Sequence, residues 1–381
     1  MNMPVKFLES RQAKHLNAVQ IEQFGQQVDA IRREIMDSIG EQDAQYIYKI
    51  RDFVRYSEIV SRGLLMFGGW IPPVWLLGTG LLGLSKIVEN MELGHNVMHG
   101  QFDWLNDPSL NGAHYDWDTM STGDDWKYTH NYIHHTYTNI VGKDHDVGYG
   151  LLRVSAAQKW EPRFLLNIPL AIQLMVFFEW YVGIQNLHLE DALIYKTRTW
   201  KQVWEDSAKF RQKAIRQIGK DYVFFPVIAG PNALPVWVGN AAANIIRNLW
   251  SSAVIFNGHF TEDVETFEVD NTENETRAEW YLRQIRGSSN FTGTAWLHIL
   301  SGNLSHQVEH HLFPDMPANR YAEAAPKIRA LCADYGIHYN EASFMKQFAS
   351  VGVRLAKHSI PNSWSATLQQ SKQKLQSLFG F

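Results

Sequence analysis

Histidines at regular spacing are the residues of this chain best suited to chemistry. Residues 306–311 read His-Gln-Val-Glu-His-His, residues 130–135 repeat the same His-x-x-x-His-His spacing, and residues 95–99 add two histidines four positions apart. Residues four apart lie on one face of a helix, so each stretch can direct imidazoles toward a common point. The three stretches together indicate a cluster that binds inorganic ions.

The type and number of these side chains point to transition metals. Neutral imidazole binds Zn, Cu, Fe or Ni. With 16 histidines in 381 residues, His-x-x-x-His-His is expected on the order of 0.03 times by chance, so two copies are unlikely to be accidental. The eight histidines of the three stretches exceed the ligands that one zinc ion takes, which predicts two metal ions.

Composition narrows the class of protein. Hydrophobic residues make up 45% of the chain and charged residues 19%, yet the mean hydropathy is only -0.27, which indicates a modest membrane part carrying a large polar cap. A net charge of -4 and the absence of a basic, aromatic-interleaved stripe exclude nucleic acid as a partner. The single cysteine, Cys332, excludes internal disulfides and Cys-ligated iron–sulfur centres. The first forty residues are polar, so membrane entry is expected from internal segments.

Apolar segments lead directly into the histidines. Residues 64–84 carry no charge and are interrupted by Pro72-Pro73, which predicts a helical hairpin of residues 53–70 and 74–93 that delivers the first histidine pair. Residues 164–187 are predicted to be interfacial or re-entrant. Residues 222–258 are predicted to form a second hairpin that turns at Gly230-Pro231 and delivers His259 at its end.

These elements predict an all-α fold with two membrane hairpins, four spans in all, and a cytosolic helical cap that holds a dimetal site. We divide the chain into residues 1–60 (amphipathic helices on the cap or membrane surface), 61–317 (membrane core with the histidine stretches) and 318–381 (a soluble helical tail). Apolar residues from Ile21 to Ile35 recur at three- and four-residue intervals, as on one helix face. Residues 292–311 are predicted to form one helix that presents the third stretch.

At this point the chain resembles a known family. The phrase His-Gln-Val-Glu-His-His-Leu-Phe-Pro, the two other histidine stretches and the preceding apolar hairpins are similar to those of integral-membrane fatty acid desaturases, over residues 64–317. Gly-His-Asn-Val-Met-His-Gly and His-His-Thr-Tyr-Thr-Asn are most similar to the mycobacterial-type stearoyl-CoA 9-desaturase branch. In relatives of the acyl-lipid and front-end type, Gln often replaces the first histidine of the third stretch, whereas His306 is present here.

The resemblance implies two irons at the cytosolic face and adds His259, after the last membrane helix, as a ninth ligand. The predicted ligands are His95, His99, His130, His134, His135, His259, His306, His310 and His311. Polar neighbours of a ligand often orient its imidazole. The candidates for this role are Glu92, Asp146, Asn257 and Glu309.

The resemblance also implies the reaction: O2-dependent introduction of a cis double bond into a long-chain acyl substrate, with acyl-CoA favoured over a phospholipid-bound chain. An unactivated methylene has no acidic proton, so a metal–oxygen oxidant is required. Electrons must come from an external ferredoxin- or reductase-type donor, because the chain has one cysteine and no Gly-x-Gly-x-x-Gly. Lys127, Lys143 and Arg153 are candidates to bind the phosphates of a CoA head group. The expected location is the bacterial inner membrane, among membrane lipid, with the site facing the cytoplasm.

Two alternatives remain open on sequence grounds. The same scaffold is compatible with hydroxylation of an alkane or a carotenoid. A non-enzymatic membrane metal carrier is less favoured, because carriers place their ligands within the spans, along a pathway, whereas these histidines follow the apolar segments.

Overall fold

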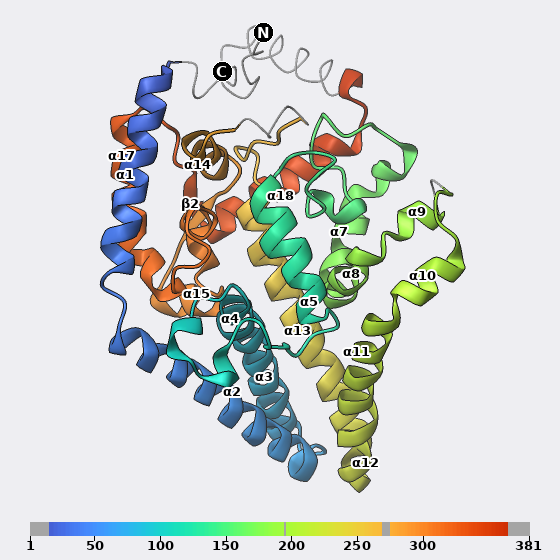
Figure 1. Cartoon of the computed structure of the whole chain (residues 1–381). Helices are drawn as coiled ribbons and strands as arrows, with labels where there is room; N and C mark the ends of the chain where they lie inside the picture. Colours follow the sequence, from blue (N-terminus) through green and yellow to red (C-terminus); the bar gives the residue numbers. More distant parts are fainter. Residues whose placement is uncertain (1–14, 194–195, 269–274, 365–381) are drawn as a thin grey trace, which may run out of the picture.

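A computed structural model describes residues 15–193, 196–268 and 275–364 of the chain (Figure 1). The helices of the first half are α1 (Ala18–Met36), α2 (Glu41–Gly68), α3 (Pro72–Val88), α4 (His95–Met98), α5 (Gly123–Trp126), α6 (His135–Tyr137), α7 (Asn167–Val176), α8 (Phe178–Ile184) and α9 (Leu189–Leu193). Those of the second half are α10 (Trp200–Asp206), α11 (Ala208–Ile218), α12 (Phe225–Ile228), α13 (Ala233–His259), α14 (Arg277–Arg286), α15 (Ala295–Leu300), α16 (Gln307–Leu312), α17 (Tyr321–Asp334) and α18 (Phe344–Ser359).

Three π-helices and a minimal sheet complete the described elements that matter for the site. The π-helices are η2 (Glu89–Gly94), η5 (Lys127–His134) and η9 (Gly219–Phe224), and two short strands, β1 (Asn290–Thr292) and β2 (Glu341–Ser343), pair in parallel. The prediction of a helical fold is confirmed for the described part of the chain.

The predicted hairpin is formed by α2 and α3. The helix α2 ends at Gly68, and Pro72 occupies the first turn of α3, where its missing N–H costs nothing. The two helices approach so closely that a Cβ on Gly68 would lie 2.5 Å from Cγ1 of Val74. Because α3 continues through η2 into α4, the hairpin carries His95 and His99 upward into the cap.

A second hairpin lies beside the first. Gly230, with φ of +54°, turns the chain between α12 and α13, as predicted, and α13 packs against α3. Figure 1 shows α2, α3, α12 and α13 running side by side toward the lower end of the molecule. The helix α13 ends at His259.

Membrane crossing is only partly supported. Among the described helices, none is by itself both long and apolar enough to span a bilayer, so the four predicted spans are not confirmed. One bent pair, Pro162–Val176 and Phe178–Leu187, meets the requirements of length and composition when taken together, with a bend of 91°. This bend lies in the segment predicted to be interfacial or re-entrant.

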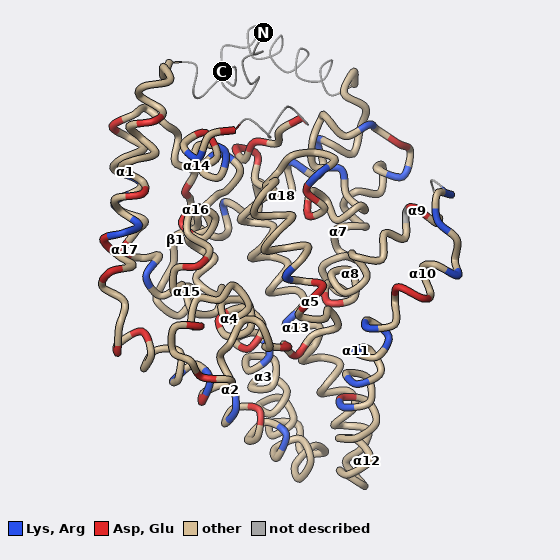
Figure 2. The backbone as a smooth tube through the Cα atoms, viewed as in Figure 1, with Lys and Arg blue, Asp and Glu red and all other residues tan. Residues whose placement is uncertain are grey.

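The lower end of the molecule is nevertheless apolar and exposed. Figure 2 shows few charged residues on the tips of the two hairpins. Large exposed apolar patches mark surfaces that bind a partner or a membrane. The exposed side chains at these tips include Phe67 (85%), Trp70 (63%), Leu76 (64%), Leu77 (61%) and Val227 (71%).

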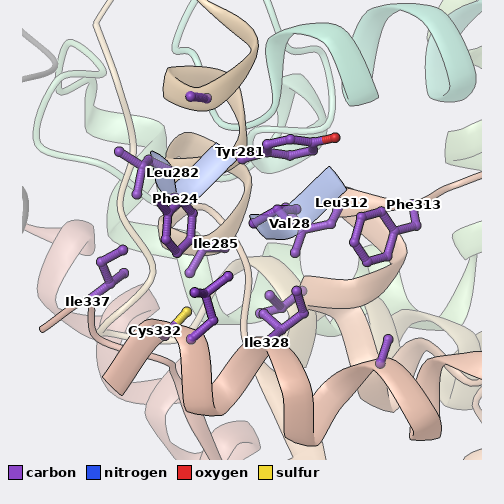
Figure 3. Close-up of a cluster of buried hydrophobic side chains, with 14 of the residues drawn as sticks. Phe24, Val28, Tyr281, Leu282, Ile285, Leu312, Phe313, Ile328, Cys332 and Ile337 are labelled. Atoms are coloured by element: carbon purple, nitrogen blue, oxygen red, sulfur yellow. The ribbon is translucent and has the colours of Figure 1, made fainter. Parts of the chain in front are cut away.

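The cap has its own hydrophobic core, built from α1, α14, α16 and α17 (Figure 3). The apolar face of α1 is buried here, with Phe24 and Val28 fully covered, so α1 packs on the cap. The crossing of α1 and α14 is close, since a Cβ on Gly25 would lie 2.6 Å from the Cβ of Ala278. Leu312 of α16 lies in the same cluster, so this core holds the helix that carries the third histidine stretch.

The prediction of one helix over residues 292–311 is wrong. The chain forms β1, then α15, and then a 3₁₀ turn, Leu304–His306, before α16 begins. Gly302 and Asn303 have φ of +67° and +54°, in the left-handed region that ends a helix. A Cβ on Gly302 would collide with the carbonyl oxygen of Met91, so this turn packs directly on η2.

The C-terminal helices pack on the rest of the chain. The helix α17 belongs to the cap core, α18 contacts α7 and α13, and β2 pairs with β1. The division at residues 60 and 317 stays a prediction, and residues 365–381 of the predicted helical tail lie outside the described residues.

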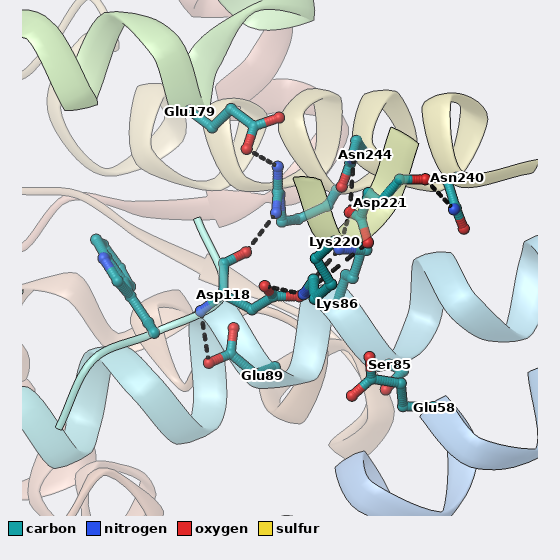
Figure 4. Close-up of polar contacts among 12 residues, drawn as sticks. Glu58, Ser85, Lys86, Glu89, Asp118, Glu179, Lys220, Asp221, Asn240 and Asn244 are labelled. Atoms are coloured by element: carbon teal, nitrogen blue, oxygen red, sulfur yellow. Dashed lines mark hydrogen bonds and ion pairs between the residues drawn. The ribbon is translucent and has the colours of Figure 1, made fainter. Parts of the chain in front are cut away.

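Buried ion pairs hold the two hairpins together (Figure 4). Lys86 of α3 pairs with Asp118 and Asp221 at 3.0 Å each, and Arg62 of α2 pairs with Asp221 at 2.9 Å. Such pairs stabilise only when both partners are present, because an unpaired buried charge is costly. The network therefore fixes α2, α3 and η9 to one another below the histidine cluster.

Candidate metal centre

Eight of the nine predicted ligands converge, although they come from parts of the chain more than two hundred residues apart. One group places a ring nitrogen of each of four residues within 4.8 Å of the others, and a second group does the same with three. The first group is His95, His99, His130 and His310, and the second is His134, His259 and His311. Two groups are the arrangement expected of a two-metal centre.

His135 lies between the two groups. Its ring centroid is 4.7 Å from that of His310, in the first group, and 4.6 Å from that of His311, in the second. Both ring nitrogens of His135 are buried and have no hydrogen-bond partner among the described residues. It is therefore available to either group.

The ring nitrogens that face the cluster fit metal ions. Buried polar atoms normally have hydrogen-bond partners, so a set without any needs an explanation. Among the converging histidines of the described residues, six Nε2 atoms are buried and unpartnered, and the Nε2 atoms of His259 and His311 face each other at 3.1 Å. The six belong to His95, His99, His130, His134, His135 and His310. Converging imidazole lone pairs are the donor set that iron and zinc take.

The π-helices supply part of this geometry. His130 and His134 lie in η5, and η2 leads into α4, where His95 begins. Each π-turn adds a residue relative to an α-helical turn, and such turns occur frequently at functional sites. The imidazoles of η5 and α4 are thereby turned toward the same point.

Partners on the opposite ring nitrogen fix several tautomers. When Nδ1 carries the proton and donates it, Nε2 presents its lone pair to a metal. The nearest partners of Nδ1 are Asn96 Oδ1 for His95 (3.0 Å), Asp144 Oδ2 for His134 (3.0 Å), Tyr321 hydroxyl for His310 (3.2 Å) and Gln284 Oε1 for His311 (2.9 Å). Sequence reasoning did not identify Gln284 or Tyr321, because nothing in their spacing relates them to the histidines.

The protonation states follow from burial and neighbouring charge. Burial opposes a charge on His134, but Asp144 and Asp146 outweigh this effect and raise its pKa above the ordinary value. Burial, added to repulsion from neighbouring imidazoles, holds the pKa of His310 and His311 well below the ordinary value. These two rings are neutral near pH 7 and can act as ligands.

Asp146 is the predicted orienting residue that lies nearest the imidazoles. Its Oδ2 is 3.7 Å from Nδ1 of His130 and 3.6 Å from Nδ1 of His134, and its Oδ1 accepts a hydrogen bond from Gln185. His130, His134 and Asp146 form a third set of donor atoms within 4.8 Å of one another. Asp144 makes a shorter contact with Nδ1 of His134 than Asp146 does, at 3.0 Å.

Glu92 and Glu309 act on the backbone that carries the ligands. Glu92 accepts hydrogen bonds from Tyr46 (2.7 Å) and Asn303 (3.0 Å), and so joins η2 to the turn before α16. Glu309 accepts from Asn290 (2.8 Å) and Tyr339 (2.9 Å), and burial raises its pKa to about 7.

Within the described residues, the side chain of Asn257 makes no hydrogen bond to an imidazole. Its Nδ2 donates to the carbonyl of Phe344 at 3.3 Å. The orienting role predicted for Asn257 therefore has no support in the geometry.

His306 is the exception among the predicted ligands. It belongs to neither group, and its ring stacks on that of His298 at 4.9 Å. The reason is local: His306 ends a 3₁₀ turn and has non-helical angles (φ -104°, ψ 55°), so the helical spacing assumed for it does not apply. Gln307, the first residue of α16, takes the place facing the cluster, with its Nε2 2.9 Å from Nε2 of His259.

A cavity of ≈ 760 Å³, its open mouth included, adjoins the cluster. His95, His130, His134 and His259 form part of its wall. Much of the rest is apolar or aromatic, which suits a hydrocarbon chain. These apolar residues include Met91, Trp117, Trp126, Phe178, Val182 and Ile255.

Trp126 links the cavity wall to the cluster. Its ring stacks on His130 with centroids 4.4 Å apart and planes 20° apart. At the polar end of the cavity, Arg247 and Glu179 pair at 2.7 Å, so neither charge is left unpaired in an otherwise apolar wall.

Two of the three candidate head-group residues have other roles. Lys127 donates to the carbonyls of Gly112 and Ala113, and Arg153 is buried, where it donates to the carbonyls of Gln158, His358 and Ile360. Lys143 lies 4.9 Å from the ring centroid of Tyr137. The predicted phosphate site is therefore not supported at Lys127 or Arg153.

Comparison with known proteins agrees with this site. The model of the family described as "Fatty acid desaturase" matches residues 69–343. The chain is 42% identical over 355 residues to a protein of Mycobacterium tuberculosis named "NADPH-dependent stearoyl-CoA 9-desaturase", covering 92% of this chain and 82% of that one. It is 28% identical over 283 residues to an "sn-1 linoleoyl-lipid 6-desaturase" of Synechocystis, covering 72% and 77%.

The family model spans most of the chain and includes all the converging histidines. The mycobacterial relative extends the likeness to nearly the whole sequence. The resemblance seen in the histidine stretches is thereby confirmed. The chain belongs to the fatty acid desaturase family of oxidoreductases.

Proposed function

We propose that this desaturase introduces a cis double bond into a long-chain acyl-CoA, using O2 and two irons held by the converging imidazoles. The observation that carries the proposal is the pair of histidine groups beside an apolar cavity. The proposed ligands are the eight histidines that converge, and His306 is left out.

The irons would supply the oxidising power needed to remove hydrogen from an unactivated methylene. In the overall reaction the acyl chain loses two hydrogen atoms, and O2 takes up four electrons and four protons to leave as two waters. Two of the electrons and two of the protons come with the hydrogens of the acyl chain. The other two electrons must come from a donor outside the chain and the other two protons from solvent.

The residues of the chain bind and position the substrate. The apolar wall near Trp117, Phe178 and Ile255 excludes water and holds the methylenes in a fixed orientation. Because the wall also contains His95, His130 and His134, it decides which carbons lie nearest the metals. Asp144 and Gln284 keep the imidazoles in the tautomer that presents Nε2.

Acyl-CoA is proposed because the mycobacterial relative is named for stearoyl-CoA, while a more distant relative is named for a lipid-bound chain. An inner-membrane location with the site facing the cytoplasm is supported by the exposed apolar tips of the two hairpins, which lie at the end of the molecule opposite the cap core. Such tips can enter the bilayer while the histidine cluster remains in the cap.

The test uses purified full-length protein in lipid nanodiscs. Metal analysis should find two irons per chain. With a ferredoxin-type donor and O2, stearoyl-CoA should yield an unsaturated acyl-CoA, and stearoyl phospholipid should yield little product. Stoichiometric zinc in an active preparation would overturn the di-iron assignment, and product from phospholipid alone would overturn the choice of substrate.

Hydroxylation, the alternative left open by the sequence, is tested in the same samples. Mass spectrometry distinguishes a loss of two hydrogens from a gain of one oxygen. A hydroxylated acyl chain as the main product would replace the proposed reaction.

A further inference from the structure

Electrons from an external donor must cross the protein to reach the buried cluster. Four segments of the described chain carry the converging imidazoles: α4 with His99 directly after it, η5 with α6, the end of α13, and α16. Every residue of α4 and of α16 is buried, as are the last four residues of α13. Of these four segments, only η5 with α6 has strongly exposed side chains, so it is a ligand-bearing segment that itself reaches the surface.

Two tyrosines form the exposed face of η5. Tyr128 and Tyr132 are 54% and 55% exposed, and their ring centroids lie 5.9 Å apart with planes 31° apart. Tyr128 is one position from Thr129, which lines the cavity, and Tyr132 lies two positions from His130 on one side and two from His134 on the other. The same helical segment therefore presents imidazoles to the metal cluster on one side and a paired aromatic surface on the other.

The surroundings of this surface are polar. Asp124, one turn before Tyr128, has a side chain that is 66% exposed, and Thr136, one turn after Tyr132, is also exposed. The apolar tips that we propose to enter the bilayer belong to other elements, α2, α3 and α12. Tyr128 and Tyr132 thus face water, where a protein partner can reach them.

We propose that Tyr128 and Tyr132 form the docking surface for the one-electron donor protein of the desaturase. This inference rests on the proposed function, which requires two external electrons per turnover. Electron transfer slows steeply with distance, and a helix with its side chains is about 10–12 Å across. Over this segment, a donor whose redox group lies near its own surface can therefore come within about one helix diameter of the ligands.

The chemistry of the surface suits such a partner. Interfaces are enriched in tyrosine, and electron-transfer complexes are small enough for two aromatic residues to matter. The donor would be oxidised by one electron in each of two encounters, and irons held by the converging imidazoles would take up both electrons. No bond of this chain is formed or broken.

The experiment compares the double variant Tyr128→Ser/Tyr132→Ser with the control Tyr56→Ser. Tyr56 is 68% exposed on α2 and lies far from η5 in sequence. The donor is a [2Fe–2S] ferredoxin kept reduced by NADPH and its reductase. We expect the KM for ferredoxin and its Kd to rise about tenfold in the double variant, as for the loss of central aromatic contacts, and to stay within twofold in the control.

Chemical reduction separates docking from catalysis. In a single turnover after reduction by dithionite, the double variant should form as much product as the unsubstituted enzyme. Unchanged ferredoxin KM and Kd, or an equal loss after dithionite, would overturn the docking assignment. A rise in the KM for stearoyl-CoA without a rise for ferredoxin would assign the surface to the substrate head group instead.

The same measurements keep the two proposals apart. Failure of the unsubstituted enzyme to form product after dithionite would count against the proposed function. Product after dithionite, but none with any ferredoxin-type donor, would leave the function standing and overturn the class of partner.

Discussion

The substitution Asp144→Asn tests how the protein holds one of the two metals. Asp144 is buried, with Oδ2 and Oδ1 at 3.0 and 3.1 Å from Nδ1 of His134. It also accepts hydrogen bonds from the backbone N–H groups of Asn139 and Asp146. Asparagine keeps an acceptor of the same shape but loses the negative charge that holds the imidazole in place.

The expected magnitude follows from this contact. Loss of a partner behind a ligating histidine typically costs 10- to 100-fold in metal affinity, which is about 1.4–2.7 kcal/mol at 1.36 kcal/mol per factor of ten. We expect the upper part of this range, because both carboxylate oxygens lie within reach of a fully buried ring. His134 groups with His259 and His311, so the loss should fall on the metal held there.

The assay is iron content after dialysis against a graded series of chelator concentrations. The variant should lose one iron per chain at a chelator concentration 10- to 100-fold lower than the unsubstituted protein requires. The matched control is Asp107→Asn, because Asp107 also caps a loop, accepting from the N–H and hydroxyl of Ser109 at 2.8 Å each. Loss of both irons together, or retention equal to that of the control, would refute the reasoning.

Three further substitutions or reactions test other parts of the structure. His306→Ala should keep two irons and turnover within about twofold, because His306 stacks on His298 outside both groups; loss of iron on metal analysis would restore it as a ligand. Cys332 is buried and its pKa is raised to about 12 by burial, so below pH 10 the thiol stays protonated and iodoacetamide should label it only on unfolding; rapid labelling of the folded protein would contradict this. The stability that the buried, protonated thiol of Cys332 contributes is fully present below pH 9 and is lost as the pH rises toward 12. Glu179→Gln leaves Arg247 buried without its anion, which costs about 3–5 kcal/mol of the free energy of unfolding. With an unfolding entropy of about 2.1 cal/mol/K per residue over 381 residues, the thermal midpoint should fall by about 4–6 °C. Adding Arg247→Met should recover part of the loss.

The sequence predicted the elements that obey simple local rules. Pro72 and Gly230 fix the two turns through backbone restrictions that depend on one or two residues, and both hairpins form there. The apolar periodicity of α1 likewise predicts its buried face. The four-residue spacing brings the imidazoles of the first two stretches to one cluster because both lie on continuous helical segments.

The same rule failed where the helix was interrupted. Asn303 adopts a left-handed conformation and a 3₁₀ turn follows, so His306 points away and Gln307 faces the cluster. Residue types alone do not reveal that the helix is interrupted, and so do not reveal which residue of the stretch faces the cluster. Gln284 and Tyr321 could not be found either, because their role depends on how α14 and α17 pack around α16.

The π-helices have a consequence for the evolution of this chain. Because an α-helix turns by about 100° per residue, one inserted residue rotates everything beyond it by that angle unless a π-turn absorbs it. In η2 and η5 the insertion lies between a packing surface and the imidazoles that follow, so a deletion there would preserve the packing of α3 while rotating His95 and His99 out of the cluster. Relatives with a deletion in one of these segments should therefore also have their downstream histidines moved by the same number of positions relative to the neighbouring residues.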